Sequence, residues 1–302
     1  MRSFVRVLPW LPARFLSALS SAIARGSFLI LWKYRRRMEE NLGAAMAKEF
    51  SSAGQRKALI RKAWRNFAQS ALETSYLMKG PKEKVLASVA IEGEEHLKRA
   101  LVKGKGVIAL SAHLGNFTMI GIRLGAAGYP MTALIKQPRD PRFARLMDGY
   151  RTGAGLVTIS AKPRREAVRK VLRALRVGSV VLIIADEFKS AGVPVEFFGV
   201  RSPAPRGPAT LALRTRAATV PMFATRDADD RMTLHIEPEI ELIKTGNREQ
   251  DVAANTELFT RHLEGMIRRY PDQWNWLGFR REGIRPRGRK VKGFQDSGVE
   301  EL

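Results

Sequence analysis

An uncharged run at residues 107–112, Val-Ile-Ala-Leu-Ser-Ala, ends in a histidine and leads directly into a turn. Six residues suffice for a central parallel strand and are too few for a helix, because buried strands of that kind are continuously apolar. Gly115 and Asn116 follow His113 and supply the turn and the start of a helix. We therefore expect the imidazole and the positive end of a helix to meet at the carboxyl edge of a sheet, where open α/β sheets place their ligands.

Strand-like and helical segments alternate after this run. Short apolar runs are separated by longer segments with helical periodicity. The repeated strand, helix, strand pattern predicts an α/β fold with a mostly parallel central sheet and helices on both faces. Strands are expected at 107–112, 131–135, 156–159 and 180–185, with helices at 117–127, 141–151 and 163–177, and two further strands at 219–224 and 232–240 predict a hairpin at one edge.

Residues 38–281 are expected to form a single domain, since 302 residues with 45% hydrophobic content are enough for one large core. Residues 38–78 contain no proline and are rich in good helix formers, which predicts helices separated at Gly54. The tail at 282–302 is rich in basic residues and glycine and has no apolar periodicity, so we expect it to be flexible.

The segment at residues 1–37 has a different composition. Residues 4–32 are mostly apolar and aromatic and lead into a basic cluster at 33–37. Arg6, Arg14 and Arg25 interrupt this segment, so no stretch reaches the roughly eighteen apolar residues that a spanning helix needs. This pattern predicts an amphipathic helical region lying in a membrane interface, with the cluster near anionic head groups. A tilted or partial span and an ordinary core helix remain as alternatives.

The charge balance also points to an anionic partner. The chain has 53 Lys and Arg against 29 Asp and Glu, a formal net charge of +24, and such a surface attracts nucleic acids or anionic membrane lipids. The basic residues are spread along the whole chain, and no helix-turn-helix, zinc or aromatic sheet-face signature accompanies them. The apolar amino end therefore favours anionic membrane lipids, and nucleic acid is the less favoured partner.

Several common chemistries are excluded by the residues that the chain lacks. It has no cysteine, no Gly-x-Ser-x-Gly motif and no phosphate-binding loop ending in Lys-Ser or Lys-Thr. Of its four histidines, His96, His113, His235 and His262, no two have the spacing of a metal site on one helix. We therefore expect neither a metal nor a bound cofactor. His113 is the histidine that follows a buried strand.

Short sequence motifs around His113 and downstream of it resemble those of a known family. Residues 111–117, Ser-Ala-His-Leu-Gly-Asn-Phe, are similar to the first block of the bacterial late lipid A acyltransferases, a branch of the lysophospholipid acyltransferase superfamily. The resemblance covers roughly residues 5 to 281. Further similar words follow in the same order at 196–199 (Glu-Phe-Phe-Gly), 206–212, 220–223, 236–238 and 271–276, and upstream at 41–42, 66–67 and 92–97.

This resemblance implies an activity and its partners. A fatty acyl group would pass from a thioester of acyl carrier protein or coenzyme A, as co-substrate, to a hydroxyl of a lipid A precursor or related glycolipid. The protein would work at the cytoplasmic face of the bacterial inner membrane, with the acceptor at the carboxyl edge of the sheet and an apolar groove for the acyl chain. His113 would be the general base that activates the hydroxyl, with no acyl-enzyme intermediate.

The resemblance also implies further site residues. Asp186 ends the strand at 180–185, where the family also has an aspartate, and is a catalytic candidate. Lys136 lies where the family usually has an arginine that contacts phosphate. Backbone N–H groups at 206–207 would stabilise the oxyanion, because they enter a helix. The substrate-binding candidates are Lys136, Arg139, Arg142, Glu187, Arg206 and Gly207.

One position departs from the family pattern. The family has Asp or Glu at the fifth residue after the histidine, and this chain has Thr118 there. A carboxylate orients an imidazole and stabilises its charged form, whereas a threonine hydroxyl supplies no charge. Three alternatives follow: another carboxylate, Asp186 first and Glu187 or Glu73 after it, orients His113; the histidine works without one; or the chain is an inactive member that binds lipid.

Overall fold

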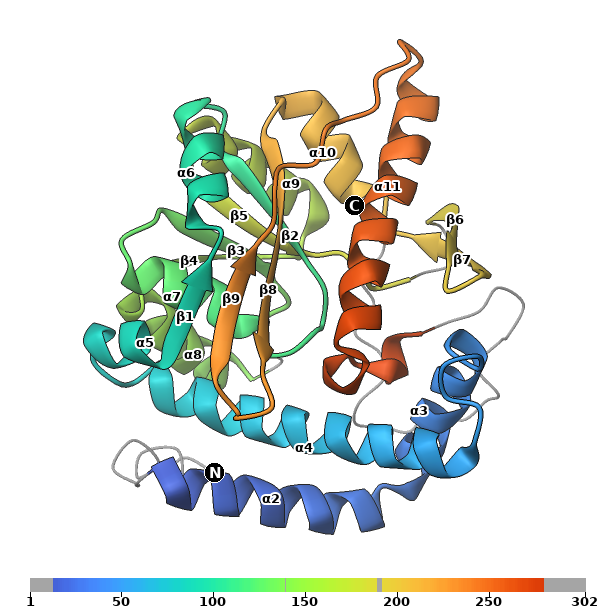
Figure 1. Cartoon of the computed structure of the whole chain (residues 1–302). Coiled ribbons are helices and arrows are strands. Elements are labelled where there is room, and N and C mark those ends of the chain that lie inside the picture. The colour runs from blue at the N-terminus through green and yellow to red at the C-terminus, as the bar shows by residue number, and fades with distance from the viewer. Residues whose placement is uncertain (1–12, 139, 189–191, 280–302) are drawn as a thin grey trace.

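The structure is a computed structural model that describes residues 13–138, 140–188 and 192–279 (Figure 1). The start of the predicted interfacial segment, Arg139 and the predicted tail at 282–302 lie outside these residues. At the centre is β2 (Val107–Ser111), the predicted buried strand, whose five residues are all buried. It pairs in parallel with β5 (Val180–Ile184) on one side and with β8 (Ala218–Arg226) on the other.

Seven strands of the described chain form one sheet in the order β1-β9-β8-β2-β5-β3-β4. Every neighbouring pair is parallel except the hairpin of β8 and β9, which confirms the predicted α/β fold with a mostly parallel sheet. The predicted edge position of this hairpin is wrong, because β1 pairs with the outer side of β9. The remaining strands are β1 (Val89–Glu92), β3 (Met131–Ile135), β4 (Leu156–Ser160) and β9 (Met232–Ile236).

Alternate residues of β2 enter two hydrophobic cores on opposite faces of the sheet. Ile108 and Leu110 belong to one core and Val107 and Ala109 to the other, as the period of two along a strand requires. Helices therefore cover both faces, as predicted. The first core is covered by α9 (Arg164–Arg176), α10 (Gly207–Thr215) and α11 (Arg248–Arg269), and the second by α5 (Lys82–Ser88), α6 (Glu94–Val102), α7 (Thr118–Ala126) and α8 (Pro141–Gly153).

Three helices precede the sheet: α2 (Ala13–Ile30), α3 (Trp32–Ala45) and α4 (Ala53–Leu77). In Figure 1, α2 runs alongside α4, and Trp64 of α4 donates a hydrogen bond to Ser27 Oγ at 2.8 Å. The predicted break at Gly54 is misplaced, because Ser52 caps α4 and Gly54 lies inside it. No described helix is both long enough and apolar enough to span a bilayer.

A second, two-stranded sheet was not predicted. It consists of β6 (Val193–Phe197) and β7 (Val200–Ala204), joined by Phe198 and Gly199 at φ of 52° and 69°. Two successive positive φ values are typical of the tight hairpin turn that matches strand twist. The turn places Phe197 and Phe198 against a buried aromatic cluster with Trp274, Trp276 and Phe279. This cluster packs the segment that follows α11, including η2 (Pro271–Gln273) and η3 (Trp276–Gly278), against the sheet.

Candidate active site

His113 lies two residues beyond the end of β2, at the carboxyl edge of the sheet. Gly115, two residues later, has φ of +57°, and a Cβ atom there would lie 2.1 Å from the Ala224 carbonyl oxygen. Only glycine allows this close approach, which the Asn116 N–H completes by donating to the same oxygen at 2.9 Å. The turn therefore fixes His113 between β2 and α7, as the sequence predicts.

Asp186 reaches the same point from the neighbouring strand. Ser111 and Ile184 are paired in register, so the residues two positions beyond each strand lie side by side. Asp186 Oδ1 is 2.8 Å from His113 Nδ1, and Asp186 Oδ2 accepts a hydrogen bond of 2.8 Å from the His113 backbone N–H. Of the three carboxylates considered for orienting the ring, Asp186 is the one that contacts it.

The segment after α11 supplies a third partner that the sequence did not predict. Gly115 N–H donates to the Gln273 carbonyl oxygen at 2.8 Å, and Asn275 N–H donates to the His113 carbonyl oxygen at 3.2 Å. This pairing places Trp274 against the carboxylate, where its Nε1–H donates to Asp186 Oδ2 at 2.7 Å. The motif at 271–276 signals family membership, and nothing in it alone indicates that a tryptophan N–H reaches the strand edge.

The electrostatics of the pair favour an ionised carboxylate and a basic imidazole. Burial alone lowers the pKa of His113, but the charge and hydrogen bond of Asp186 raise it by more, so that pKa lies above its usual value. Burial raises the pKa of Asp186, while His113 and the hydrogen bonds from His113 and Trp274 lower it by more, so that pKa lies below its usual value. Nδ1 therefore carries a proton toward the carboxylate.

The other ring nitrogen is the one that can act. Nε2 of His113 has no hydrogen-bond partner among the described residues, and 29% of the side chain is exposed. Phe117 packs edge-on against the ring with centroids 5.0 Å apart. A buried carboxylate, an oriented ring and an Nε2 atom without a described partner can together act as a general base.

Thr118 is the first residue of α7, and among the described contacts its hydroxyl makes no hydrogen bond to His113. Glu73, one of the alternative carboxylates, is instead paired with Arg226 and accepts a hydrogen bond from Gln69 at 3.0 Å. Glu187 is exposed, and its charge adds only a minor upward effect to the pKa of His113. Thr118 therefore leaves the position of the family's acid uncharged. The negative charge beside His113 comes instead from Asp186, which follows the adjacent strand.

None of the other described candidates is hydrogen-bonded to His113 by a described contact, and Lys136 and Arg142 follow β3 at the carboxyl edge of the sheet. Lys136 follows β3, which is separated from β2 by β5, so it lies roughly 10 Å away across the sheet. Arg142 is exposed at the start of α8, and Arg139 lies outside the described residues. Arg206 occupies the N-cap position of α10 without a side-chain capping hydrogen bond and pairs with Glu249 at 2.9 Å, and Gly207 is the buried first residue of that helix. No described hydrogen bond joins any of these residues to the ring.

Side chains of α4 and α3 bind the turn after His113 and the segment that carries Trp274. Thr74 of α4 donates to Asn116 Oδ1 at 2.9 Å, and Asn66 of α4 donates to the Asp272 carbonyl oxygen at 2.8 Å. Asn41 in α3 donates to the Trp276 carbonyl oxygen at 2.7 Å. Asn41 and Asn66 belong to two upstream motifs of the family resemblance, at 41–42 and 66–67. Their side chains therefore fix the segment that carries Trp274.

Comparison with known proteins decides the family. The family model described as bacterial lipid A biosynthesis acyltransferase matches residues 2–281, which is nearly the whole chain. The chain belongs to that family. Members of the lipid A biosynthesis acyltransferase family transfer acyl groups to lipids, so the family assigns this chain an acyl donor and a lipid acceptor.

Individual acyltransferases show the same relationship at lower identity. Phosphatidylinositol mannoside acyltransferase of Mycolicibacterium smegmatis is 26% identical over 274 residues, covering 87% of each chain. Lipid A biosynthesis palmitoleoyltransferase of Escherichia coli is 27% identical over 241 residues, covering 78% of this chain and 75% of that protein. A lipid A biosynthesis acyltransferase of Haemophilus influenzae is 27% identical over 188 residues, covering 61% of this chain and 56% of that protein.

Proposed function

We propose that this acyltransferase moves a fatty acyl group from an acyl thioester to a hydroxyl of a lipid A precursor or related glycolipid, with His113 as general base. The observation that supports this most directly is the 2.8 Å contact between His113 Nδ1 and the buried Asp186 carboxylate. With Nδ1 held in this way, Nε2 is the atom that faces the acceptor hydroxyl.

The proposed reaction needs no covalent enzyme intermediate. His113 Nε2 takes the proton of the acceptor hydroxyl as its oxygen attacks the thioester carbonyl. Asp186 stabilises the resulting imidazolium without itself being protonated. The tetrahedral intermediate then expels the thiolate, which takes the proton back from Nε2 and leaves as the thiol of acyl carrier protein or coenzyme A. The ring is neutral again at the end.

The oxyanion of that intermediate needs hydrogen-bond donors. The first-turn N–H groups of α10 have no partners within the helix, and α10 leads back to the start of β8, so its first turn is the end of the helix farther from the amino edge of the sheet. Gly207 supplies such a group, whereas Pro208 has none. We assign this helix start to the oxyanion and the Lys136 and Arg142 cations to a phosphate of the acceptor.

We place the protein at the cytoplasmic face of the inner membrane as a peripheral protein. The end of α2 carries large apolar side chains that face solvent: Leu29 is 71% exposed and Ile30 is 77% exposed. Trp32 is also exposed, and the basic cluster at 33–37 follows at once. Apolar and aromatic residues next to basic ones are typical of helices that lie in the interface of anionic bilayers.

The second candidate function is that of an inactive family member that binds lipid. The observation behind it is Thr118, which leaves the usual position of the acid uncharged. The Asp186 contact argues against it, because the ring already has a carboxylate. Activity measurements separate the two, since lipid binding alone leaves the acylation of cellular lipids unchanged.

The test compares lipids from cells that lack this protein with lipids from cells that express it, by mass spectrometry. Wild-type protein should add one fatty acyl group to a glycolipid, and His113→Ala should reduce that product by about 10³-fold or more, because the base is gone. His262→Ala, at an exposed histidine of α11, is the matched control and should behave as wild type. An unchanged lipid profile with wild-type protein would favour the lipid-binding alternative.

A further inference from the structure

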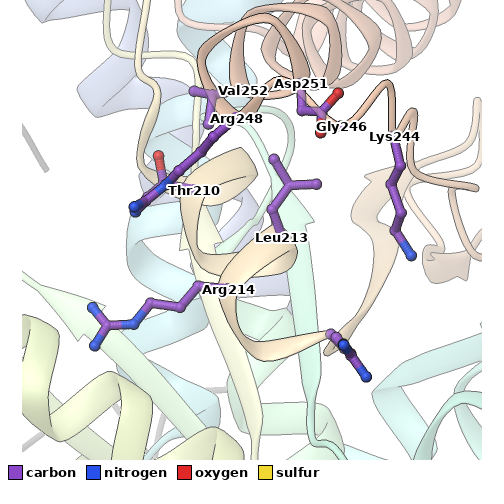
Figure 2. A pocket seen from close by; sticks show the side chains of 9 residues that line it. Thr210, Leu213, Arg214, Lys244, Gly246, Arg248, Asp251 and Val252 are labelled. Carbon is purple, nitrogen blue, oxygen red and sulfur yellow. The ribbon is translucent and has the colours of Figure 1, made fainter.

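A cavity of about 930 Å³ lies between α10 and the first turn of α11, outside the candidate active site (Figure 2). In Figure 2 the side chain of Leu213 lies between those of Arg248 and Lys244. A cavity of this volume is within the range of sites for small organic ligands and is larger than one phosphate requires. Its lining residues are Thr210, Leu213, Arg214, Arg216, Lys244, Gly246, Arg248, Asp251 and Val252.

The end of the cavity lined by Arg216 and the ring of His113 lie at opposite edges of the sheet. Ala218, at the start of β8, is paired in register with Val107, at the start of β2. Arg216 precedes Ala218 and therefore lies at the amino edge, whereas His113 follows the other end of β2. The two are on the order of 20 Å apart along the strands. The lining residues include neither His113 nor its partners Asp186 and Trp274, so the cavity is separate from these groups.

Four cations line the cavity without acidic partners. Arg214, Arg216, Lys244 and Arg248 are all exposed, and none of them forms an ion pair with a described residue. The carboxylate of Asp251, the only acidic lining residue in the described cavity, accepts two hydrogen bonds from Thr245, at 2.6 and 2.7 Å. Like charges gathered in this way repel one another, so an anion bound among them is favoured.

The neighbouring charges and the apolar lining residues limit the class of ligand that fits the cavity. Just outside the cavity, the acid Glu249 pairs with Arg206 at 2.9 Å and with none of the four lining cations. Leu213 and Val252 add an apolar surface. A ligand that satisfies both features carries at least two negative charges and also an organic body, as phosphate esters do.

We propose that this cavity binds a phosphate ester of about nucleotide size. Phosphate esters occur as soluble compounds and as lipid head groups, and the arrangement of the molecule favours the soluble source. In Figure 1, α2 lies at the opposite end of the molecule from the start of α11. A bilayer in contact with α2 does not reach the cavity. The ligand bridges α10, which begins at the candidate oxyanion site, and α11, which leads to Trp274.

The test measures binding of ADP to the full-length protein by isothermal titration calorimetry. Saturable binding is expected, and the double variant Arg214→Glu/Arg248→Glu should weaken it by at least about tenfold, because charge-assisted hydrogen bonds are lost. Arg176→Glu/Arg173→Glu, at exposed arginines of α9 outside the cavity, is the control with the same charge change and should bind ADP as wild type does. Equal weakening in both variants, or no saturable binding to wild type, overturns the proposal.

Two further probes identify the source of the phosphate. Inorganic pyrophosphate should bind more weakly than ADP, because it has no body to contact Leu213 and Val252. Vesicles of phosphatidylcholine with phosphatidic acid should bind the cavity variant and the α9 control equally. Vesicle binding that falls only in the cavity variant, with no ADP binding to wild type, would assign the cavity to a lipid head group and overturn the soluble source. None of these measurements depends on acyl transfer.

Discussion

His113 and His235 each hold Nδ1 against a carboxylate, but in different surroundings. His113 is 2.8 Å from Asp186 at the centre of the sheet, and His235 in β9 is 3.0 Å from Glu92 in β1. The side chain of Asp186 is 2% exposed, whereas that of Glu92 is 68% exposed. His235 Nε2 is also 3.0 Å from Thr225 Oγ1, while the corresponding atom of His113 has no described partner.

The difference explains why we propose His113, and not His235, as the base. A buried carboxylate interacts strongly with the ring because little water screens it, and an exposed one contributes little. A nitrogen that already has a hydrogen-bond partner is not available to a substrate. His113 therefore has both properties that a base needs, and His235 has neither. Four substitutions test this comparison.

Asp186→Asn should have the largest effect. We expect kcat to fall by about 10³-fold or more, because the amide removes the charge that orients the ring and stabilises its protonated form. The base must be neutral to act, so wild-type activity should rise with pH through the raised pKa of His113. In the variant burial lowers that pKa and only the minor upward effect of Glu187 opposes it, so the rise should move to lower pH. A pH profile of kcat/KM checks this, and an unmoved profile would contradict the assigned pair.

Trp274→Phe should have a smaller effect and shift the profile the other way. It removes the indole N–H that donates to Asp186 Oδ2, so the carboxylate is less stabilised by its surroundings and attracts the His113 proton more strongly. We expect an activity loss of about tenfold and a rise of activity at higher pH than in wild type. Thermal unfolding of both proteins serves as the control for packing, and a shift to lower pH would rule out this role for the indole.

Thr118→Glu should change activity by less than about threefold, because Asp186 already occupies His113 Nδ1. Steady-state rates of the purified proteins measure this effect, with Thr118→Gln as the uncharged control of similar size. A sharp rise with Glu alone would mean that the ring lacks an effective carboxylate in the wild-type protein.

His235→Asn should have the smallest effect. Its partner is exposed, and pairs of this kind contribute about 1 kcal/mol or less to the free energy of unfolding. Activity should stay within about twofold of wild type, and urea unfolding should show at most a slight loss of stability. A large loss of activity here would remove the distinction between the two histidines.

The fold was largely predictable because it rests on local periodicity. The uncharged run before His113 and the alternation after it indicate a parallel sheet, and Asp186 could be placed at the carboxyl edge because it follows the adjacent strand. The prediction failed where the outcome depends on distant partners. The hairpin is not at the edge of the sheet because β1, which is distant in the sequence, pairs with β9. The strands β6 and β7 were not predicted because they contain Pro194 and Pro203, and proline is untypical of strands.

The site was predictable in part for the same reason. The residues that follow strands are visible in the sequence, since each lies at the end of an apolar run. Trp274 is brought to Asp186 by a segment 88 positions away, and no local pattern indicates that contact. Asn66 and Thr74 likewise occupy helical positions that show no sign of the backbone and side chain that they bind.

The backbone N–H of His113 binds Asp186 Oδ2 whatever side chain the residue carries. When the ring is removed in His113→Ala, the carboxylate still has this amide and the Trp274 indole to hold it in place. The variant thus keeps an ordered anion beside a space of imidazole size. Free imidazole added to that variant is expected to occupy the space, lie against the carboxylate and restore the proposed proton transfer, which would separate the ring from the chain that normally carries it.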